Sequence, residues 1–161
     1  MDDFPNLKNP FHFLATLGGI GKIPLAPGTF GSIFSWLIFI FLSHFVNMFY
    51  VTLIGIFLSI WICDKASVNL THKDHRSIVI DELIGIWIAL LPVLYLANTQ
   101  KERIVYAIAA LLFFRIFDIF KPFPVSYFDE NFKNGTGIVI DDLIAGVMAM
   151  IPSYIILTLL T

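Results

Sequence analysis

Acidic side chains occur as two adjacent pairs in similar sequence surroundings. Asp81-Glu82 follows the apolar run 78–80, and Asp141-Asp142 follows the apolar run 138–140, sixty positions later. An apolar stretch follows each pair, and small residues come one turn after the acids. Small residues at this spacing let two helices approach closely. Two such helices, packed against each other, would bring four carboxylates together.

Four carboxylates in one place repel one another unless a cation lies among them. Oxygen ligands without a nearby Cys or His cluster suit a hard divalent ion, most naturally Mg²⁺. The simpler alternative is that acids in a first helical turn only stabilise the helix dipole. One pair alone would favour this alternative, whereas two matched pairs favour a metal site.

A further acid belongs to a group of charged residues near the end of another apolar stretch. Arg115, Asp118 and Lys121 are spaced by three residues, which places them on one helical face. The local sequence supports two interpretations equally: an ion-pair ladder, or two cations for a phosphate with one more acid for a metal. Two Gly-containing loops, 27–32 and 135–137, add backbone donors, and Thr29 or Ser32 is expected to cap the following helix.

The composition restricts the elements that can position these groups. Hydrophobic residues make up 58% of the 161 residues and charged residues only 14%, against roughly 45–50% and about 25% in ordinary domains. A net charge of −2 and a lone Cys63 exclude a nucleic-acid binder driven by basic charge and a disulfide scaffold. The composition favours a small integral membrane protein over an unusually apolar soluble helical domain.

We expect one all-α domain over residues 1–161, a polytopic membrane bundle of about five hydrophobic helices. A short interfacial helix is expected to begin at Asn9-Pro10, since Asn caps helices and Pro suits the first turn. A turn near His44 and Asn47 would separate the first two spans. The five spans are expected at about 30–45, 48–65, 82–97, 103–120 and 141–160.

Basic residues are expected to collect on one side of such a bundle. Two cations, Lys101 and Arg103, would lie on one face, and the other face would carry most of the remaining ones: Lys8, Lys22, Lys73, Arg76, Lys121 and Lys133. The positive-inside rule makes this richer face cytoplasmic. Nearly all acids are on the same side, so the expected site faces the cytoplasm.

These motifs resemble those of the bacterial phosphatidylglycerophosphatase A family. The resemblance covers about residues 9–150 and rests on several runs in one order: Asn9-Pro10, Pro27-Gly28-Thr29-Phe30-Gly31-Ser32, Asp74-His75, Ser77 to Gly85, Phe114-Arg115 to Asp118, Lys121-Pro122-Phe123-Pro124, Asp129, Gly137, Asp141-Asp142 and Ala145-Gly146-Val147. Asp64 is not part of the family pattern.

The resemblance implies a Mg²⁺-dependent phosphatase of the bacterial inner membrane that converts phosphatidylglycerophosphate to phosphatidylglycerol and inorganic phosphate. The expected metal ligands are Asp81, Glu82, Asp141, Asp142 and Asp118, and Asp74 is a sixth catalytic candidate. Arg115 and Lys121, with Thr29 and Ser32, are expected to bind the phosphate. His75 could protonate the leaving oxygen, although a solvated loop histidine is the better interpretation.

Two other classes of protein stay open at this point. Carboxylates on repeated short helices could form a divalent-cation site in a small channel or transporter, where internal repeats are common. The acids could also only cap helices in a structural membrane subunit. The expected partners are the lipid substrate and the bilayer, with no nucleic acid, and the sequence leaves the oligomeric state open.

Overall fold

In the computed structural model, residues 4–70, 75–132 and 134–160 are described, and the regular elements among them are all helical. This confirms the all-α expectation. The elements are α1 Pro10–Ala15, the 3-10 turn η1 Ile20–Lys22, α2 Pro27–Leu42, α3 Met48–Ala66, α4 Ile80–Leu90, α5 Val93–Leu96, α6 Gln100–Phe120, α7 Val125–Asn131 and α8 Gly135–Leu160.

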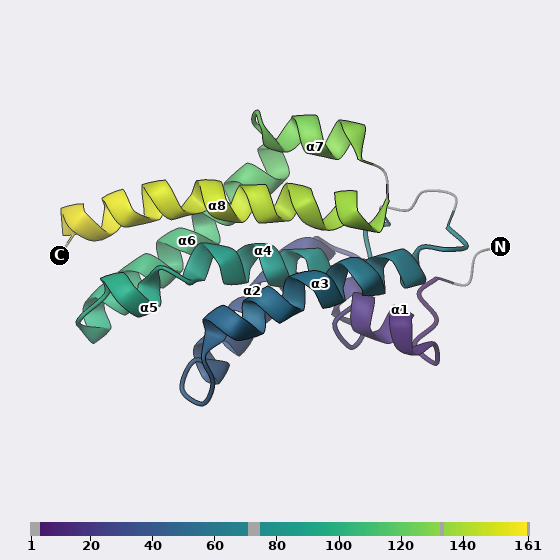
Figure 1. The fold of residues 1–161 in the computed structure, drawn as a ribbon, viewed down its shortest axis with the longest axis horizontal. Helices are drawn as coiled ribbons and strands as arrows, with labels where there is room; N and C mark the ends of the chain where they lie inside the picture. Colours follow the sequence, from purple (N-terminus) through teal and green to yellow (C-terminus); the bar gives the residue numbers. More distant parts are fainter. Residues whose placement is uncertain (1–3, 71–74, 133, 161) are drawn as a thin grey trace.

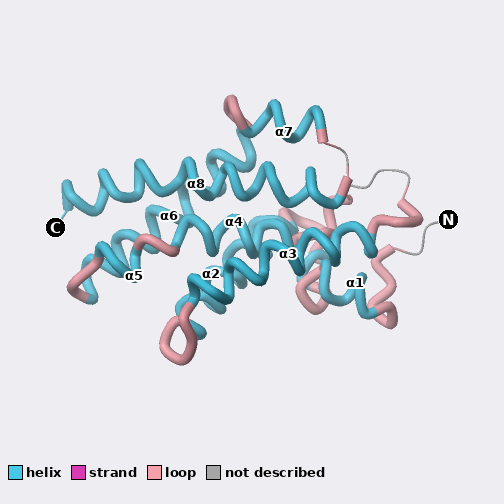
Figure 2. The backbone as a smooth tube through the Cα atoms, viewed as in Figure 1, coloured by secondary structure: helices cyan, strands magenta, loops and turns pink. Residues whose placement is uncertain are grey.

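The long helices run roughly along the longest axis of the molecule (Figure 1), and most connections between them lie at its two ends (Figure 2). The central helix is α4, which packs against α2, α3, α6 and α8. Most of its side chains are buried, including Ile84, Ile86 and Leu90. The start of α4 is therefore surrounded by neighbouring helices, and its acidic pair lies in that first turn.

Local sequence signals explain several helix ends. The side chain of Asn9 accepts a hydrogen bond from the Phe11 amide at the start of α1, as expected. Asn47 caps α3 in the same way, which confirms the expected turn after α2. At the start of α6, Thr99 and Glu102 form a reciprocal capping box.

The first residues of α2 differ from expectation. The helix begins at Pro27, whose fixed φ suits a first helical position, and Ala26 precedes it in a left-handed conformation. Thr29 and Ser32 therefore lie inside the helix, and the expectation that one of them caps it was wrong. Their hydroxyl groups are instead available to a neighbouring helix.

The last helix begins six residues before the expected span. The stretch 135–137, expected as a loop, forms the first turn of α8. The carboxylate of Asp64, at the end of α3, accepts a hydrogen bond of 2.8 Å from the Gly135 amide, one of the donors that a helix start leaves unpaired. As a result, Asp141 and Asp142 lie about two turns inside α8 and not at its mouth.

Two other segments also differ from the expected spans. The span expected at 82–97 is divided into α4 and the short α5, with a turn at Leu91-Pro92, and the turn agrees with the inability of Pro to donate a helical hydrogen bond. The connection before α8 contains the short helix α7, which the sequence did not predict.

The small residues that follow the two acidic pairs meet at the α4–α8 contact. A Cβ atom added at Gly85 would lie 2.8 Å from the backbone oxygen of Asp142, and one added at Gly146 would collide with the backbone oxygen of Gly85. The backbones of α4 and α8 therefore touch where side chains are absent. This confirms the expected packing of the two repeated helices.

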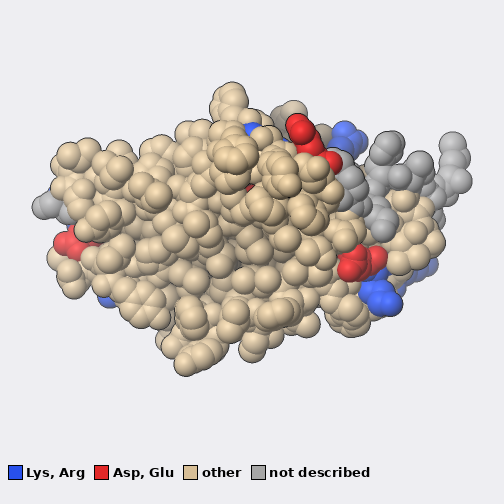
Figure 3. Space-filling view, turned by 45° about the horizontal axis from the view of Figure 1, so that its top comes forward, with Lys and Arg blue, Asp and Glu red and all other residues tan. Residues whose placement is uncertain are grey.

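The surface carries a broad apolar zone between two charged ends. In Figure 3, red and blue side chains gather toward the end that holds α1 and α7, a few lie at the opposite end, and tan covers the middle. Among the described residues, two helices have the length and hydropathy to cross a membrane, α3 with 19 residues and α8 with 26, so the five expected spans stay a prediction. The apolar α2 is shorter, with 16 residues.

Candidate active site

Three carboxylates from α4 and α8 converge at one place in the described part of the chain. Asp81 and Glu82 come from the first turn of α4 and Asp142 from α8, and one ligand oxygen of each lies within 4.8 Å of the others. Asp81 and Asp142 are buried. The three acids come together because the backbones of α4 and α8 touch about one turn further along each helix, at Gly85 and Gly146.

Asp118 extends this group toward α6. Its carboxyl group lies within hydrogen-bonding reach of Asp142 and forms an ion pair with Arg115, three residues earlier in α6. The Arg115 and Asp118 side chains are 17% and 16% exposed, so the ion pair is still partly accessible. With Asp81 and Glu82, four carboxylates are close to one guanidinium, and the group carries excess negative charge.

The guanidinium of Arg115 also contacts the first turns of α2. Its Nη1 donates to the Ser32 hydroxyl and its Nη2 to the Thr29 hydroxyl, each at 3.3 Å. The Ser32 hydroxyl in turn donates to the Gly28 carbonyl at 2.9 Å. The residues expected to bind phosphate from α2 and α6 thus lie together, although their helices are far apart in the sequence.

Gly28 contributes through the absence of a side chain. A Cβ atom at this position would collide with Glu82 Oε1 and would lie 3.4 Å from the Arg115 guanidinium. The start of α2 therefore lies directly over the carboxylates and the cation. Sequence reasoning gave Gly28 no such role, although the family resemblance included it.

The second acid of the α8 pair faces another partner. Lys121 Nζ lies 2.8 Å from Asp141 Oδ2 and 2.7 Å from Asp129 Oδ1. Burial alone would lower the pKa of the Lys121 ammonium, but its hydrogen bonds to the two carboxylates outweigh this effect and raise the pKa above its usual value. Lys121 thus connects the end of α6 to α7 and α8, and the role of Asp129 was not anticipated.

The oxygen atoms of the three-carboxylate group fit a hard divalent cation. The donors are carboxylates, which Mg²⁺ prefers, and Glu82 Oε2 is buried without a hydrogen-bond partner among the described residues. An unpaired buried carboxylate oxygen is costly, and a cation would remove that cost. Asp118 lies beside the group, whereas Asp141 is directed to Lys121.

Two other candidates from the sequence, His75 and Asp64, lie elsewhere. A third, Asp74, falls outside the described residues. The neighbouring His75 accepts a hydrogen bond from the Ser77 amide at its Nδ1, and its ring packs against Phe4. Asp64 binds the start of α8, which gives it a structural role.

Comparison with known proteins gives a consistent result. Residues 13–157 match the family model described as phosphatidylglycerophosphatase A. The chain is 38% identical over 154 residues to phosphatidylglycerophosphatase A of Haemophilus influenzae, covering 94% of this chain and 91% of the relative. It is 37% identical to the Escherichia coli protein of the same name, and the match covers 89% of this chain and 81% of that relative.

A third relative carries a different name. A Bacteroides thetaiotaomicron protein, whose name proposes a phosphatidylinositol-3-phosphatase, is 36% identical over 155 residues, covering 90% of this chain and 94% of the relative. No solved structure matches the chain significantly. The family match spans the helices that form the candidate site, from α2 to α8. The chain belongs to the phosphatidylglycerophosphatase A family.

Proposed function

We propose that this protein removes the terminal phosphate of phosphatidylglycerophosphate, giving phosphatidylglycerol and inorganic phosphate. Family membership supports this reaction, and so do the names of the Haemophilus influenzae and Escherichia coli relatives. The observation that carries the proposal is the junction of Asp81, Glu82 and Asp142 with Arg115. A phosphate monoester needs both cationic charge and a polarised attacking oxygen, and this junction offers positions for both.

We assign each residue a role from the contacts that it makes. Arg115 presents a planar fork suited to phosphate oxygens, and the Thr29 and Ser32 hydroxyls hold that fork in place. Asp118 pairs with the guanidinium and limits its rotation. Lys121 is held by Asp129 and Asp141, so we assign it to positioning Asp141 and α7 and not to direct phosphate contact.

We further propose Mg²⁺ as the cofactor, held by Asp81, Glu82 and Asp142 with Asp118 beside them. When bound, the ion would neutralise phosphate charge and lower the pKa of a water. Without a cation, the excess of carboxylates would repel a phosphate dianion. The chain's own acids therefore make phosphate binding depend on a metal.

The membrane setting is also part of the proposal. The apolar zone between the charged ends, and the two helices long enough to cross, support an inner-membrane protein. We infer five crossings by α2, α3, α4–α5, α6 and α8, with α1 at the interface. By the positive-inside rule, basic residues at the end that holds the site support a site that faces the cytoplasm.

Purified protein in detergent tests the activity directly. We expect phosphate release from phosphatidylglycerophosphate with Mg²⁺, and its loss when EDTA is added and its return when excess Mg²⁺ follows. Phosphatidic acid and a phosphorylated inositol lipid serve as comparison substrates, because the three relatives differ in name. Absence of phosphate release would contradict the proposal, and cation flux in proteoliposomes without phosphatase activity would favour the channel alternative.

A further inference from the structure

Helices α2 and α6 lie side by side, and hydrogen bonds join them at two levels. At the site, Arg115 of α6 contacts Thr29 and Ser32 of α2. Further along, the Trp36 indole Nε1 donates to the Ala107 carbonyl at 2.8 Å. Because the two helices are joined at both levels, they form a continuous seam that starts at the candidate site.

Apolar side chains line the outer edge of this seam. On α2 and α6, residues spaced by three or four positions share one face, and those that border the seam are exposed: Ile33, Leu37 and Ile40 on α2, and Ile104, Ile108 and Leu112 on α6. The chain has no charged residue from Ile33 to Ile62 or from Ile104 to Phe114. Along α2 and α6, the surface that leads away from Arg115 therefore carries no charged side chain until Arg103 near the start of α6.

The seam ends in a cavity of about 310 Å³. Its walls come from α2 and the turn after it, the α4–α5 region and α6. Most of the lining is apolar, including Trp36, Phe39 and Ile108, and the polar lining residues are Ser43, His44, Gln100 and Arg103. Ile40 and Ile104 belong both to this cavity and to the apolar edge of the seam. The volume lies at the lower end of the range of about 300–1,000 Å³ typical of small-molecule sites.

We propose that the α2–α6 seam binds an acyl chain of the phospholipid substrate, with the cavity receiving its far end. The inference rests on the proposed function, which supplies a lipid whose phosphate is at Arg115. From Arg115 to Ile104, eleven residues of α6 extend about 16 Å. This is about half of the roughly 30 Å hydrocarbon core, and half of the core is the depth that one acyl chain occupies.

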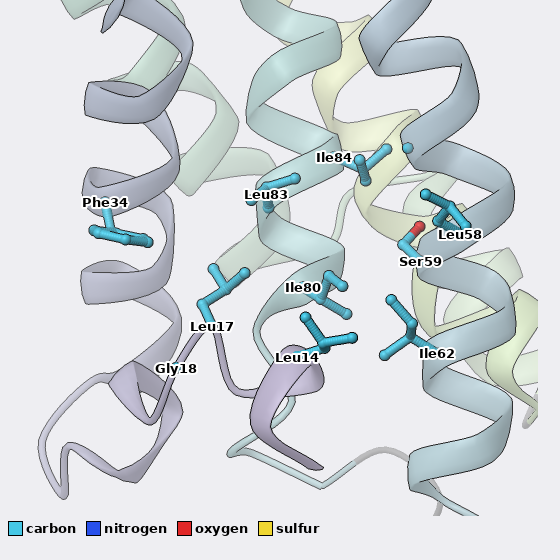
Figure 4. Close-up of a pocket in the computed structure, with 11 residues that line it drawn as sticks. Leu14, Leu17, Gly18, Phe34, Leu58, Ser59, Ile62, Ile80, Leu83 and Ile84 are labelled. Atoms are coloured by element: carbon cyan, nitrogen blue, oxygen red, sulfur yellow. The ribbon is translucent and has the colours of Figure 1, made fainter. Parts of the chain in front are cut away.

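A second cavity gives a contrasting case. It is an apolar groove of about 420 Å³ between α1, α2, α3 and α4, and Figure 4 shows Ile80, Leu83 and Ile84 of α4 directed toward it. These three residues share one face of α4, whereas Glu82 and Gly85 are on another. The body of α4 therefore separates this groove from the carboxylates, and we assign no substrate chain to it.

Substitution of Ile108 tests the seam. Ile108 lines the cavity at the end of the seam, and Ile108→Trp would fill that cavity. We therefore expect kcat/KM for dioleoyl phosphatidylglycerophosphate to fall about tenfold or more. The fall for the deacylated head group, glycerophosphoglycerophosphate, should be much smaller. Leu53→Trp is the matched control, because Leu53 of α3 is 47% exposed, as against 48% for Ile108, and lines neither cavity. Leu58→Trp fills the second groove.

The outcomes separate the two proposals. An equal loss on both substrates in Ile108→Trp, or a selective loss in Leu58→Trp alone, would overturn the seam assignment while leaving the phosphatase intact. Failure of the wild-type protein to hydrolyse either substrate would contradict the proposed function itself.

A measurement on the wild-type protein does not depend on whether a variant folds. Phosphatidylglycerophosphate with a diazirine in mid-chain should, after illumination, label peptides of α2 and α6. Labelling confined to α1 and α3 would place the chain in the other groove and overturn the inference.

Discussion

Negative charge exceeds positive charge at the junction of α4, α6 and α8, and this imbalance determines what each residue can contribute. Asp81, Glu82 and Asp142 lie close together, and Asp118 beside them pairs with the Arg115 guanidinium. The Thr29 and Ser32 hydroxyls of α2 accept hydrogen bonds from that guanidinium. Removal of one carboxylate charge changes both the affinity for a cation and the local repulsion. Substitutions that keep the shape and change only the charge are therefore the most informative.

We expect Glu82→Gln to lower Mg²⁺-dependent phosphate release by about 100-fold or more, because removal even of outer-shell partners of a metal costs about 10–100-fold. The control is Glu102→Gln, which changes the same residue type at the opposite end of the molecule. Titration of Mg²⁺ against activity measures the effect. A variant with normal turnover at low Mg²⁺ would remove Glu82 from the metal site.

The sequence predicted this junction well but not completely. Matched acidic pairs followed by small residues predicted that α4 and α8 would meet, and Gly85 and Gly146 do meet. Within α8, however, adjacent side chains differ in direction by about 100°. Asp142 therefore faces α4 while Asp141 faces Lys121, a distinction that depends on where the end of α6 comes to lie.

Helix contacts, and not the acids alone, hold these side chains in place. The backbones of α4 and α8 touch at Gly85 and Gly146, so the distance between the two acidic groups depends on the absence of side chains there. Added volume at this contact must push the helices apart, because a backbone oxygen cannot move aside as a side chain can.

Gly146→Ala is expected to lower the free energy of unfolding in detergent by about 1–3 kcal/mol, as overpacking does. The matched control is Gly55→Ala, where the added Cβ atom meets side chains and no backbone: the flexible end of Ile84 at 2.8 Å and the Trp87 ring at 3.8 Å. Thermal denaturation of both variants provides the comparison. Equal midpoints for the two variants would contradict a rigid α4–α8 contact.

Helix boundaries were harder to predict than helix existence. The stretch 135–137 was predicted as a loop. In the structure, the Asp64 carboxylate of α3 accepts a hydrogen bond from the Gly135 amide, and α8 includes all three residues. The short α7 has little apolar periodicity of its own, and Lys121 ties it to the bundle through Asp129. The first feature depends on a residue 71 positions away, and the second on an ion pair between residues eight positions apart across a turn. Local helix propensity includes neither contact.

At the scale of the whole molecule, the face drawn in Figure 3 carries charged side chains at two ends with an uncharged zone between them, and many large hydrophobic side chains of the helices are exposed. The site lies at the end with more charged groups, and Lys101 and Arg103 lie at the other end. This arrangement predicts that a membrane separates Glu130, in α7, from Lys101, at the start of α6. The composition predicted the apolar surface, but it could not show which helices expose it.

Thiol labelling tests this orientation, since Cys63 is buried and should not react. A membrane-impermeant maleimide should label Lys101→Cys in spheroplasts and Glu130→Cys only in inverted vesicles. Labelling of both positions from the same side would show that the two ends do not face opposite compartments.

The uncharged stretch of α6 between Arg103 and Arg115 has one more consequence. The twelve residue steps from Arg103 to Arg115 span about 18 Å, well short of a roughly 30 Å hydrocarbon core. A bilayer beside this stretch would thin locally, or Arg115 would lie below the level of the lipid head groups. Hydrophobic mismatch at α6 would thus bring the lipid surface down to the carboxylates, so that the substrate need not leave its leaflet to reach them.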